Sequence, residues 1–119
     1  MIAEGQIVLF RFPQTDLATG KLRPALVLRK LPGQYDDWLI CMISSKLDQC
    51  IAGFDEVITH GDADFDASGL KMPSLLRTSR LAVVDGEILL GRLGKIEDRR
   101  LIRIKQRISE WVNSREAVK

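Results

Sequence analysis

The feature that most constrains the fold is a series of short apolar runs separated by turn-forming residues. The run WLICMI at residues 38–43 is apolar at every position, which for so short a segment predicts a strand covered on both faces. Strands are expected at residues 6–12, 24–29, 38–43, 56–59, 74–84 and 87–93. Such closely spaced strands predict a mainly β fold, a small and strongly curved sheet or barrel of about five to seven strands.

The first connections follow from proline, glycine and polar residues. Residues 13–22, PQTDLATGKL, predict a long exposed loop, and residues 30–37 predict a turn. Pro24 restricts the preceding residue to an extended conformation. It is therefore expected to mark the start of the second strand and to hold Arg23 at that strand's end.

Two further features predict how the later strands bend and connect. Asp85-Gly86 stands between two apolar runs, which is a strong signal for a β-hairpin. Gly91 and Gly94 are expected to bend the sheet.

The C-terminal stretch changes to a helical period and predicts one amphipathic helix at residues 97–113. Its expected packing face consists of Leu101, Ile104, Ile108, Trp111 and Val112. The basic residues Arg99, Arg100, Arg103, Lys105 and Arg107 are expected to project elsewhere, toward solvent. The acids at residues 97 and 98 suit the positive end of the helix dipole.

Composition and charge are those of one soluble globular domain, expected to span residues 1–119. The formal net charge of +2 implies no polyanion partner unless cations cluster locally. No signal peptide is evident, and no stretch approaches the ~18 apolar residues of a membrane span, so a cytoplasmic protein without a membrane partner is expected. Cys41 and Cys50 are expected to be reduced structural thiols, with a disulfide or a reactive thiol as the alternative.

The sequence lacks the common cofactor and catalytic motifs, including GxGxxG, a Walker loop, paired CxxC, HExxH and GxSxG. The lone histidine, His60, is expected on a solvated loop, with an acid–base role as the alternative. Asp62, Asp64 and Asp66 alternate as metal ligands can, but no partner ligands are evident, so these residues are also expected to be solvated. No metal and no cofactor is expected.

Short polar interruptions at the ends of the apolar runs form the candidate site. Arg23 precedes the second run, SSK at residues 44–46 follows the third, and RTSR at residues 77–80 interrupts a later one. In a small curved sheet these positions can converge on one cleft, where arginine forks and hydroxyl groups suit a phosphodiester. Alternatively, Arg23 and Arg77 form surface ion pairs and the serines simply end strands.

Four blocks of sequence occur in an order that is more specific than any single block. They read GQIVLFRFP at residues 5–13, KLRPALVL at 21–28, ICMISSK at 40–46 and SLLRTSRL at 74–81. LLGRLGKI at residues 89–96 and the amphipathic helix follow. Together they resemble the MazF/PemK family of toxins from type II toxin–antitoxin systems, and in particular its PemK-like branch.

This resemblance implies a small SH3-like barrel of the CcdB/MazF type with a C-terminal helix, a homodimer, and metal-independent cleavage of single-stranded RNA. It also implies a cognate antitoxin whose acidic segment occupies the RNA groove. Arg23 and Ser44 match the family's catalytic pair, and Arg77 matches an arginine that contacts RNA. The other side chains expected to bind RNA are Ser45, Lys46, Ser74, Ser79 and Arg80.

The implied chemistry is attack of the RNA 2′-hydroxyl on its neighbouring phosphate, which gives a 2′,3′-cyclic phosphate and a 5′-hydroxyl. Arg23 would stabilise the transition state rather than act as a base, because arginine essentially never deprotonates. Ser44 would hold a phosphate oxygen or orient the 2′-hydroxyl. Some relatives carry aspartate where this chain has Ser79, or histidine where it has Leu22, so no general base is identified.

The alternative function is a non-catalytic binding module on the same fold, or a degenerate toxin that acts on a protein as CcdB-type gyrase poisons do. The simultaneous presence of Arg23, Ser44 and Arg77 favours the ribonuclease, because a pure binder has no need of all three.

Overall fold

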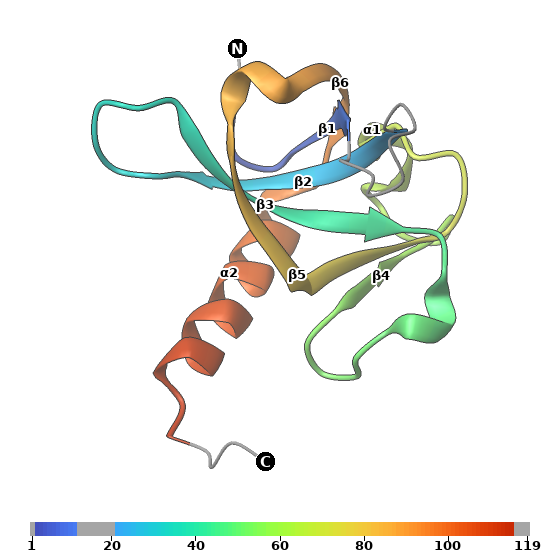
Figure 1. The fold of residues 1–119 in the computed structure, drawn as a ribbon. Helices are drawn as coiled ribbons and strands as arrows, with labels where there is room; N and C mark the ends of the chain where they lie inside the picture. Colours follow the sequence, from blue (N-terminus) through green and yellow to red (C-terminus); the bar gives the residue numbers. More distant parts are fainter. Residues whose placement is uncertain (1, 12–20, 116–119) are drawn as a thin grey trace.

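The computed structural model describes residues 2–11 and 21–115 (Figure 1). Their elements, in chain order, are β1 (Gln6–Arg11), β2 (Leu22–Lys30), β3 (Asp37–Ser44), the 3-10 helix η1 (Leu47–Gln49), β4 (Glu56–Ile58), α1 (Phe65–Ser68), β5 (Ser74–Asp85), the 3-10 helix η2 (Gly86–Ile88), β6 (Leu89–Lys95) and α2 (Asp98–Asn113). The expected strands and the C-terminal helix are therefore confirmed, with small shifts at their ends. Phe12 and most of the expected loop at residues 13–22 lie outside the described residues.

The strands form one six-stranded sheet in the order β4-β5-β3-β2-β1-β6, and all neighbours are antiparallel. In the described part of the chain β4 and β6 are its edges, so the sheet is not closed and the expected barrel is not confirmed. Register shifts interrupt the β1–β6, β2–β3 and β3–β5 pairings, and such bulges bend and twist a sheet. Gly91 and Gly94 border the two shifts between β1 and β6, where a bend was expected.

The expected hairpin at Asp85-Gly86 is wrong. β5 leads into η2, and β6 pairs with β1 at the far side of the sheet. Asp85 caps η2, because its carboxylate accepts a hydrogen bond from the backbone N of Glu87 at 2.9 Å. A side chain at Gly86 would overlap the carboxylate of Asp36. This Asp-Gly pair therefore begins a helical turn and does not close a two-residue loop.

Apolar side chains cover both faces of the central strands, as the unbroken run in β3 predicts. The helix-side face carries the cluster of Ile7, Leu26, Leu28, Cys41, Ile43, Ile58, Phe65, Leu76, Ile96, Leu101 and Ile104. The opposite face, here called the Trp38 face, carries Val8, Phe10, Ala25, Val27, Trp38, Ile40 and Leu89. Successive residues of β1, β2 and β3 alternate between the two clusters because side chains alternate across a strand. The alternation therefore assigns every residue of these strands to one face.

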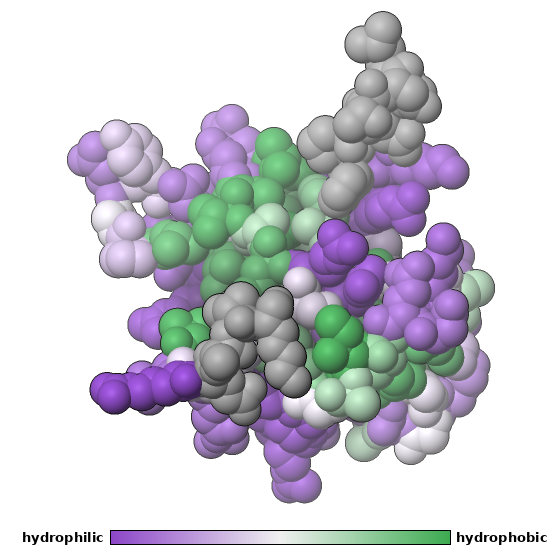
Figure 2. All heavy atoms as spheres, turned by 60° about the horizontal axis from the view of Figure 1, so that its bottom comes forward, coloured by the Kyte–Doolittle hydropathy of each residue, from purple (hydrophilic) through white to green (hydrophobic). Residues whose placement is uncertain are grey.

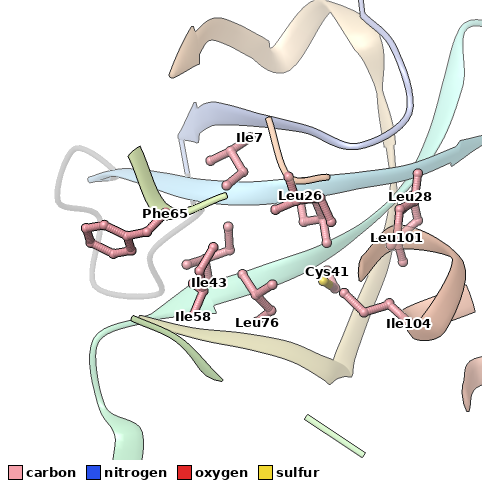
Figure 3. Close-up of a cluster of buried hydrophobic side chains, with 11 residues drawn as sticks. Ile7, Leu26, Leu28, Cys41, Ile43, Ile58, Phe65, Leu76, Leu101 and Ile104 are labelled. Atoms are coloured by element: carbon pink, nitrogen blue, oxygen red, sulfur yellow. The ribbon is translucent and has the colours of Figure 1, made fainter. Parts of the chain in front are cut away.

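The helix α2 packs on the helix-side cluster through its first three turns, where Ile108 is partly buried, as expected. Leu101 and Ile104 are buried and reach the helix-side cluster, as Figure 3 shows. Trp111 and Val112 were expected on the same buried face, but they are 61% and 67% exposed. The last turns of α2 extend past the sheet (Figure 1), where the ring of Trp111 makes an edge contact with that of Phe54 at a centroid distance of 5.9 Å. Figure 2, which brings this end forward, shows hydrophobic surface broken up by strongly hydrophilic side chains.

Three arginines of α2 bind the acids of β4 and of the segment before α1, an arrangement here called the arginine clamp. Arg100 was expected to be solvated, yet it is only 4% exposed. Its Nε and Nη2 donate to the two carboxylate oxygens of Asp64 at 2.8 and 3.0 Å, and its Nη1 donates to Glu56 at 2.7 Å. Arg103 donates twice to Glu56, and Arg107 lies 3.2 Å from the same carboxylate. The clamp joins the C-terminal helix to the edge strand β4.

The expectation that the three aspartates are solvated is also wrong for Asp64, which is 4% exposed. Burial acts to raise the pKa of Asp64, but hydrogen bonds from Arg100 and from the backbone N of Glu97, with the Arg100 charge, outweigh it and hold the pKa below its ordinary value. Burial likewise acts to lower the pKa of Arg100, and its acidic partners raise it overall. Both groups are therefore charged in the fold.

Candidate functional site

Arg23 lies within β2 rather than at its end, because the strand begins at Leu22 and not at Pro24. On one side Arg23 pairs with Phe10 of β1. On the other side the β2–β3 pairing starts only at Ala25, one residue beyond Pro24. Since proline has no N–H to donate, its position explains why the ladder stops there. The Arg23 side chain is exposed and makes no hydrogen bond or ion pair with any described residue.

Ser44 ends β3 and pairs with Leu75 of β5. Its Oγ accepts a hydrogen bond from the backbone N of Lys46 at 3.1 Å. A hydroxyl can accept and donate at once, so the proton of Ser44 remains available for a ligand oxygen. Ser45 and Lys46 follow at the exposed start of the next connection.

Arg77 lies on β5 opposite Met42 and is half-buried. Its Nη1 donates a hydrogen bond to Oε1 of Gln49 at 3.0 Å. Its Nε is buried and has no hydrogen-bond partner among the described atoms. An unpaired buried donor costs free energy, about 1–3 kcal/mol, which a ligand oxygen that reached it would recover.

The sheet register brings Arg23, Ser44 and Arg77 onto one face. Cross-strand partners share a face, and Ala25, Met42 and Arg77 form one row across β2, β3 and β5. Ala25 belongs to the Trp38 face, so Arg77 lies on that face. Arg23 and Ser44 are each two residues farther along their strands, and two residues return a side chain to the same face. The β2–β3 register, continued from Ala25 and Met42, leads to Arg23 opposite Ser44.

Two of the other residues expected to bind RNA are engaged within the protein. Ser74 pairs with Ile58, which places it on the helix-side face, and its hydroxyl donates to the backbone O of Met72 at 2.8 Å. Ser79 donates its hydroxyl to Asp55 at 3.2 Å. Arg80 is exposed, so its guanidinium is accessible to a ligand.

Sequence reasoning missed two residues that contact this region, Gln49 and Asp55. Gln49 belongs to η1 and Asp55 to the connection before β4, in the stretch whose sequence pattern is hardest to interpret. Their partners on β5 are more than twenty positions away along the chain, with separations of 28 for Gln49 and 24 for Asp55. No local pattern could have revealed either contact.

The remaining candidates for chemistry do not belong to this row of residues. His60 is exposed on the segment after β4, as expected, with its ring 4.5 Å from that of Phe65. Cys41 and Cys50 are both free, and burial, with the nearby Asp55 charge, raises the pKa of the Cys41 thiol to about 12. Within residues 2–11 and 21–115, no three acidic, histidine or cysteine side chains gather as a metal site requires.

Comparison with known proteins identifies the chain's family. A model of the family described as PemK-like, MazF-like toxins of type II toxin–antitoxin systems matches residues 3–112. The chain belongs to this toxin family. Among solved structures it is similar to the Mycobacterium tuberculosis toxin MazF-mt6, with 15% sequence identity, a TM-score of 0.63, and coverage of 91% of this chain and 96% of that one. A comparison with curated protein sequences gives no match.

The family assignment accounts for the order of the sequence blocks, and the structural likeness shows that the toxin fold is shared. None of the helices in the described residues has the length and apolar character needed to cross a membrane.

Proposed function

We propose that this toxin is a metal-independent, sequence-specific endoribonuclease that cleaves single-stranded mRNA and so inhibits translation and growth. The observation that carries the proposal is the alignment of Arg23, Ser44 and Arg77 on the Trp38 face of three adjacent strands. Adjacent strands lie about 4.8 Å apart, so these side chains are within reach of one phosphodiester and its neighbours. Two arginine forks and a free hydroxyl proton match the acceptor oxygens of such a group.

In this proposal Arg23 carries the electrostatic part of catalysis. Its guanidinium has no partner among the described residues, so it can bind the non-bridging oxygens whose negative charge grows as the 2′-hydroxyl attacks. It rises from a strand that pairs with β1 at that residue, which limits backbone motion. Removing a preorganised donor of this kind typically costs roughly 3 kcal/mol, or about a hundredfold in rate.

Ser44 and Arg77 complete the arrangement by holding the substrate. Ser44 donates its hydroxyl proton to a phosphate oxygen or orients the 2′-hydroxyl. Arg77 binds a neighbouring phosphate, helped by the exposed cations Lys46 and Arg80 and by Ser45. The products are a 2′,3′-cyclic phosphate and a 5′-hydroxyl, and DNA is not cut because it lacks the attacking group.

The wider assembly is also part of this proposal and follows from the family. The chain forms a single toxin domain over residues 1–119, adopts the SH3-like barrel topology of its relatives, works in the cytoplasm as a homodimer, and is neutralised by a cognate antitoxin. An acidic antitoxin segment over Arg23 and Arg77 would block the same face that binds RNA.

A cleavage assay in EDTA tests the proposal. Purified toxin, free of antitoxin, is incubated with a long single-stranded RNA of mixed sequence and with single-stranded DNA of the same sequence. Discrete RNA fragments with 5′-hydroxyl ends, and intact DNA, are expected. Arg23→Ala should abolish cutting in a protein with an unchanged circular dichroism spectrum, whereas Arg29→Ala, an exposed arginine later on the same strand, should cut normally.

Two results would contradict this function. Equal cutting by wild type and Arg23→Ala would show that the activity comes from another site or from a contaminant. No cutting of any RNA by a well-folded protein would favour a non-catalytic binding module.

A further inference from the structure

Asp55 is a buried carboxylate next to the candidate site, and the mechanism above does not use it. It is 5% exposed, and no lysine or arginine in the described part of the chain forms an ion pair with it. Its hydrogen bonds come from neutral groups: the backbone N of Ile51 at 2.9 Å, the backbone N and the Oγ of Ser79 at 3.0 and 3.2 Å, and a longer bond from the Oγ1 of Thr78 at 3.4 Å. Burying a charge without a countercharge is expensive, so these bonds are needed to keep it there.

The bonds from Ser79 tie Asp55 to an irregularity in β5. Met42 pairs with Arg77, but the preceding residue of β3, Cys41, pairs with Leu81. Residues 78–80 are therefore a bulge that β3 does not match. Thr78, in the same bulge, donates its hydroxyl to the backbone O of Phe54 at 2.6 Å. Phe54 and Asp55, which come directly before β4, together hold the bulge from the β4 edge of β5.

Arg77 is the last residue before this bulge, so the bulge geometry sets the direction of its side chain. A strand without the bulge would keep a regular alternation and pair residues 78–80 with β3. Beyond the backbone, the Arg77 side chain has one hydrogen bond, from Nη1 to the neutral amide of Gln49. Its Nε has no hydrogen-bond partner among the described atoms. The backbone therefore sets the direction in which the Arg77 side chain leaves the strand, and the bond to Gln49 holds its far end.

We propose that Asp55 is a positioning residue for Arg77: by binding the backbone N and the hydroxyl of Ser79, it fixes the bulge that directs the Arg77 guanidinium to the RNA-binding face. The inference rests on the proposed function, in which Arg77 binds an RNA phosphate. Asp55 itself touches no substrate in this scheme, and its effect reaches the RNA only through Arg77.

The test compares Asp55→Asn and Ser79→Ala with a matched control, Asp64→Asn. Asparagine keeps the shape of Asp55 but can accept hydrogen bonds at only one of the two positions, and Ser79→Ala removes a single bond, so it remains informative if Asp55→Asn fails to fold. Asp64 is as buried as Asp55 but binds α2 and not β5. The first readout is the heteronuclear NOE of the Arg77 Nε–Hε group in 15N-labelled protein, assigned with Arg77→Lys, because it reports local mobility directly.

The second readout is binding of a single-stranded DNA oligonucleotide, an uncleavable probe, followed at the same Arg77 signal, and the third is the KM for RNA cleavage. Asp55→Asn and Ser79→Ala should lower the NOE and raise both the probe Kd and KM about three- to tenfold, with kcat within about twofold, as expected for one weakened hydrogen bond. Asp64→Asn should lower the unfolding free energy and leave all three readouts at wild-type values.

Three outcomes overturn the inference or separate it from the proposed function. If Asp55→Asn destabilises the fold but leaves the Arg77 NOE and probe Kd unchanged, Asp55 is merely structural. If Asp64→Asn changes the Arg77 signal as much as Asp55→Asn does, the effect is general loosening and the inference also fails. If the wild type cuts no RNA, the proposed function fails, whereas the NOE comparison in the free protein still supports or overturns the positioning role.

Discussion

Arg77 donates one hydrogen bond from Nη1 to Oε1 of Gln49 at 3.0 Å, so a neutral amide occupies one arm of this guanidinium in the free toxin. A phosphate group that binds Arg77 through the same Nη1 donor must displace that amide. The competition is mild because a neutral acceptor binds a guanidinium less strongly than an anion does. The contact keeps the arginine in place at little cost to substrate binding.

Replacing Gln49 with glutamate should turn this contact into a competing ion pair. We expect Gln49→Glu to raise the KM for RNA about tenfold at low ionic strength, with kcat little changed, and the effect should shrink as salt screens the pair. Gln49→Ala removes the competitor and should give a KM equal to or below that of the wild type. Steady-state cleavage at two salt concentrations measures both, and an equal rise in KM for the two variants would show that the amide supports substrate binding.

Arg23→Lys should lower kcat at least tenfold even though the charge is retained. Lysine offers a single ammonium group, and it cannot form the two parallel hydrogen bonds that an arginine fork makes to phosphate oxygens. Arg29→Lys is the matched control on the same strand, and its kcat should equal that of the wild type. If Arg23→Lys had the same kcat as the wild type, the role of Arg23 would be to supply positive charge and not directed hydrogen bonds.

Asp64→Asn should destabilise the fold by about 3 kcal/mol at neutral pH, because the buried Arg100 guanidinium loses the negative charge of one of its carboxylate partners. The pKa of Asp64 is depressed in the fold, so its contribution is complete above the unfolded pKa and is lost as the pH falls through the folded value. The difference in unfolding free energy between wild type and variant should therefore narrow below about pH 4. Urea unfolding at a series of pH values measures this difference.

The exposed neighbour Asp66 provides the control for that measurement. Asp66→Asn should change the unfolding free energy by less than about 0.5 kcal/mol at any of these pH values. A difference between wild type and Asp64→Asn that stayed constant down to acid pH would show that the Asp64 charge does not stabilise the fold.

Gly94→Ala should destabilise the protein by about 1–3 kcal/mol, because a Cβ there would overlap the backbone of Ala67 and Ser68, where α1 lies against β6. Gly91 is on the same strand, and its Cβ position has no atom within 4 Å, so Gly91→Ala should be nearly neutral. Thermal unfolding of both variants measures these changes in stability. Similar losses of stability would mean that chain flexibility, and not the close approach of α1, requires the glycines.

Much of the fold could be predicted because strands and helix have local periodic signals. The strands and α2 lie close to their expected positions, since alternation and helical spacing depend only on neighbouring residues. Strand pairing depends on distant residues, and there the prediction failed. Asp85-Gly86 has the composition of a hairpin loop, but β6 finds its partner in β1, which a local signal cannot show.

The charged residues show the same limit for the site and the clamp. Arg23, Ser44 and Arg77 became candidates because they interrupt or flank apolar runs and match positions of the toxin family, and the register then places them on one face. Arg100 and Asp64 were expected in solvent because each looks like an ordinary polar residue in its own segment. They are 36 positions apart, and only the folded chain shows that each neutralises the other.

The arginine clamp also has a consequence for how the protein is made. Glu56 and Asp64 are translated before the arginines of α2 that neutralise them, which follow more than thirty residues later. Until α2 has left the ribosome, burial of these acids would leave two negative charges uncompensated. Burying an unpaired charge costs free energy, so the nascent chain is not expected to bury them before then. The sheet edge around β4 can therefore be completed only once α2 has emerged, which couples this step of folding to the synthesis of the C-terminal helix.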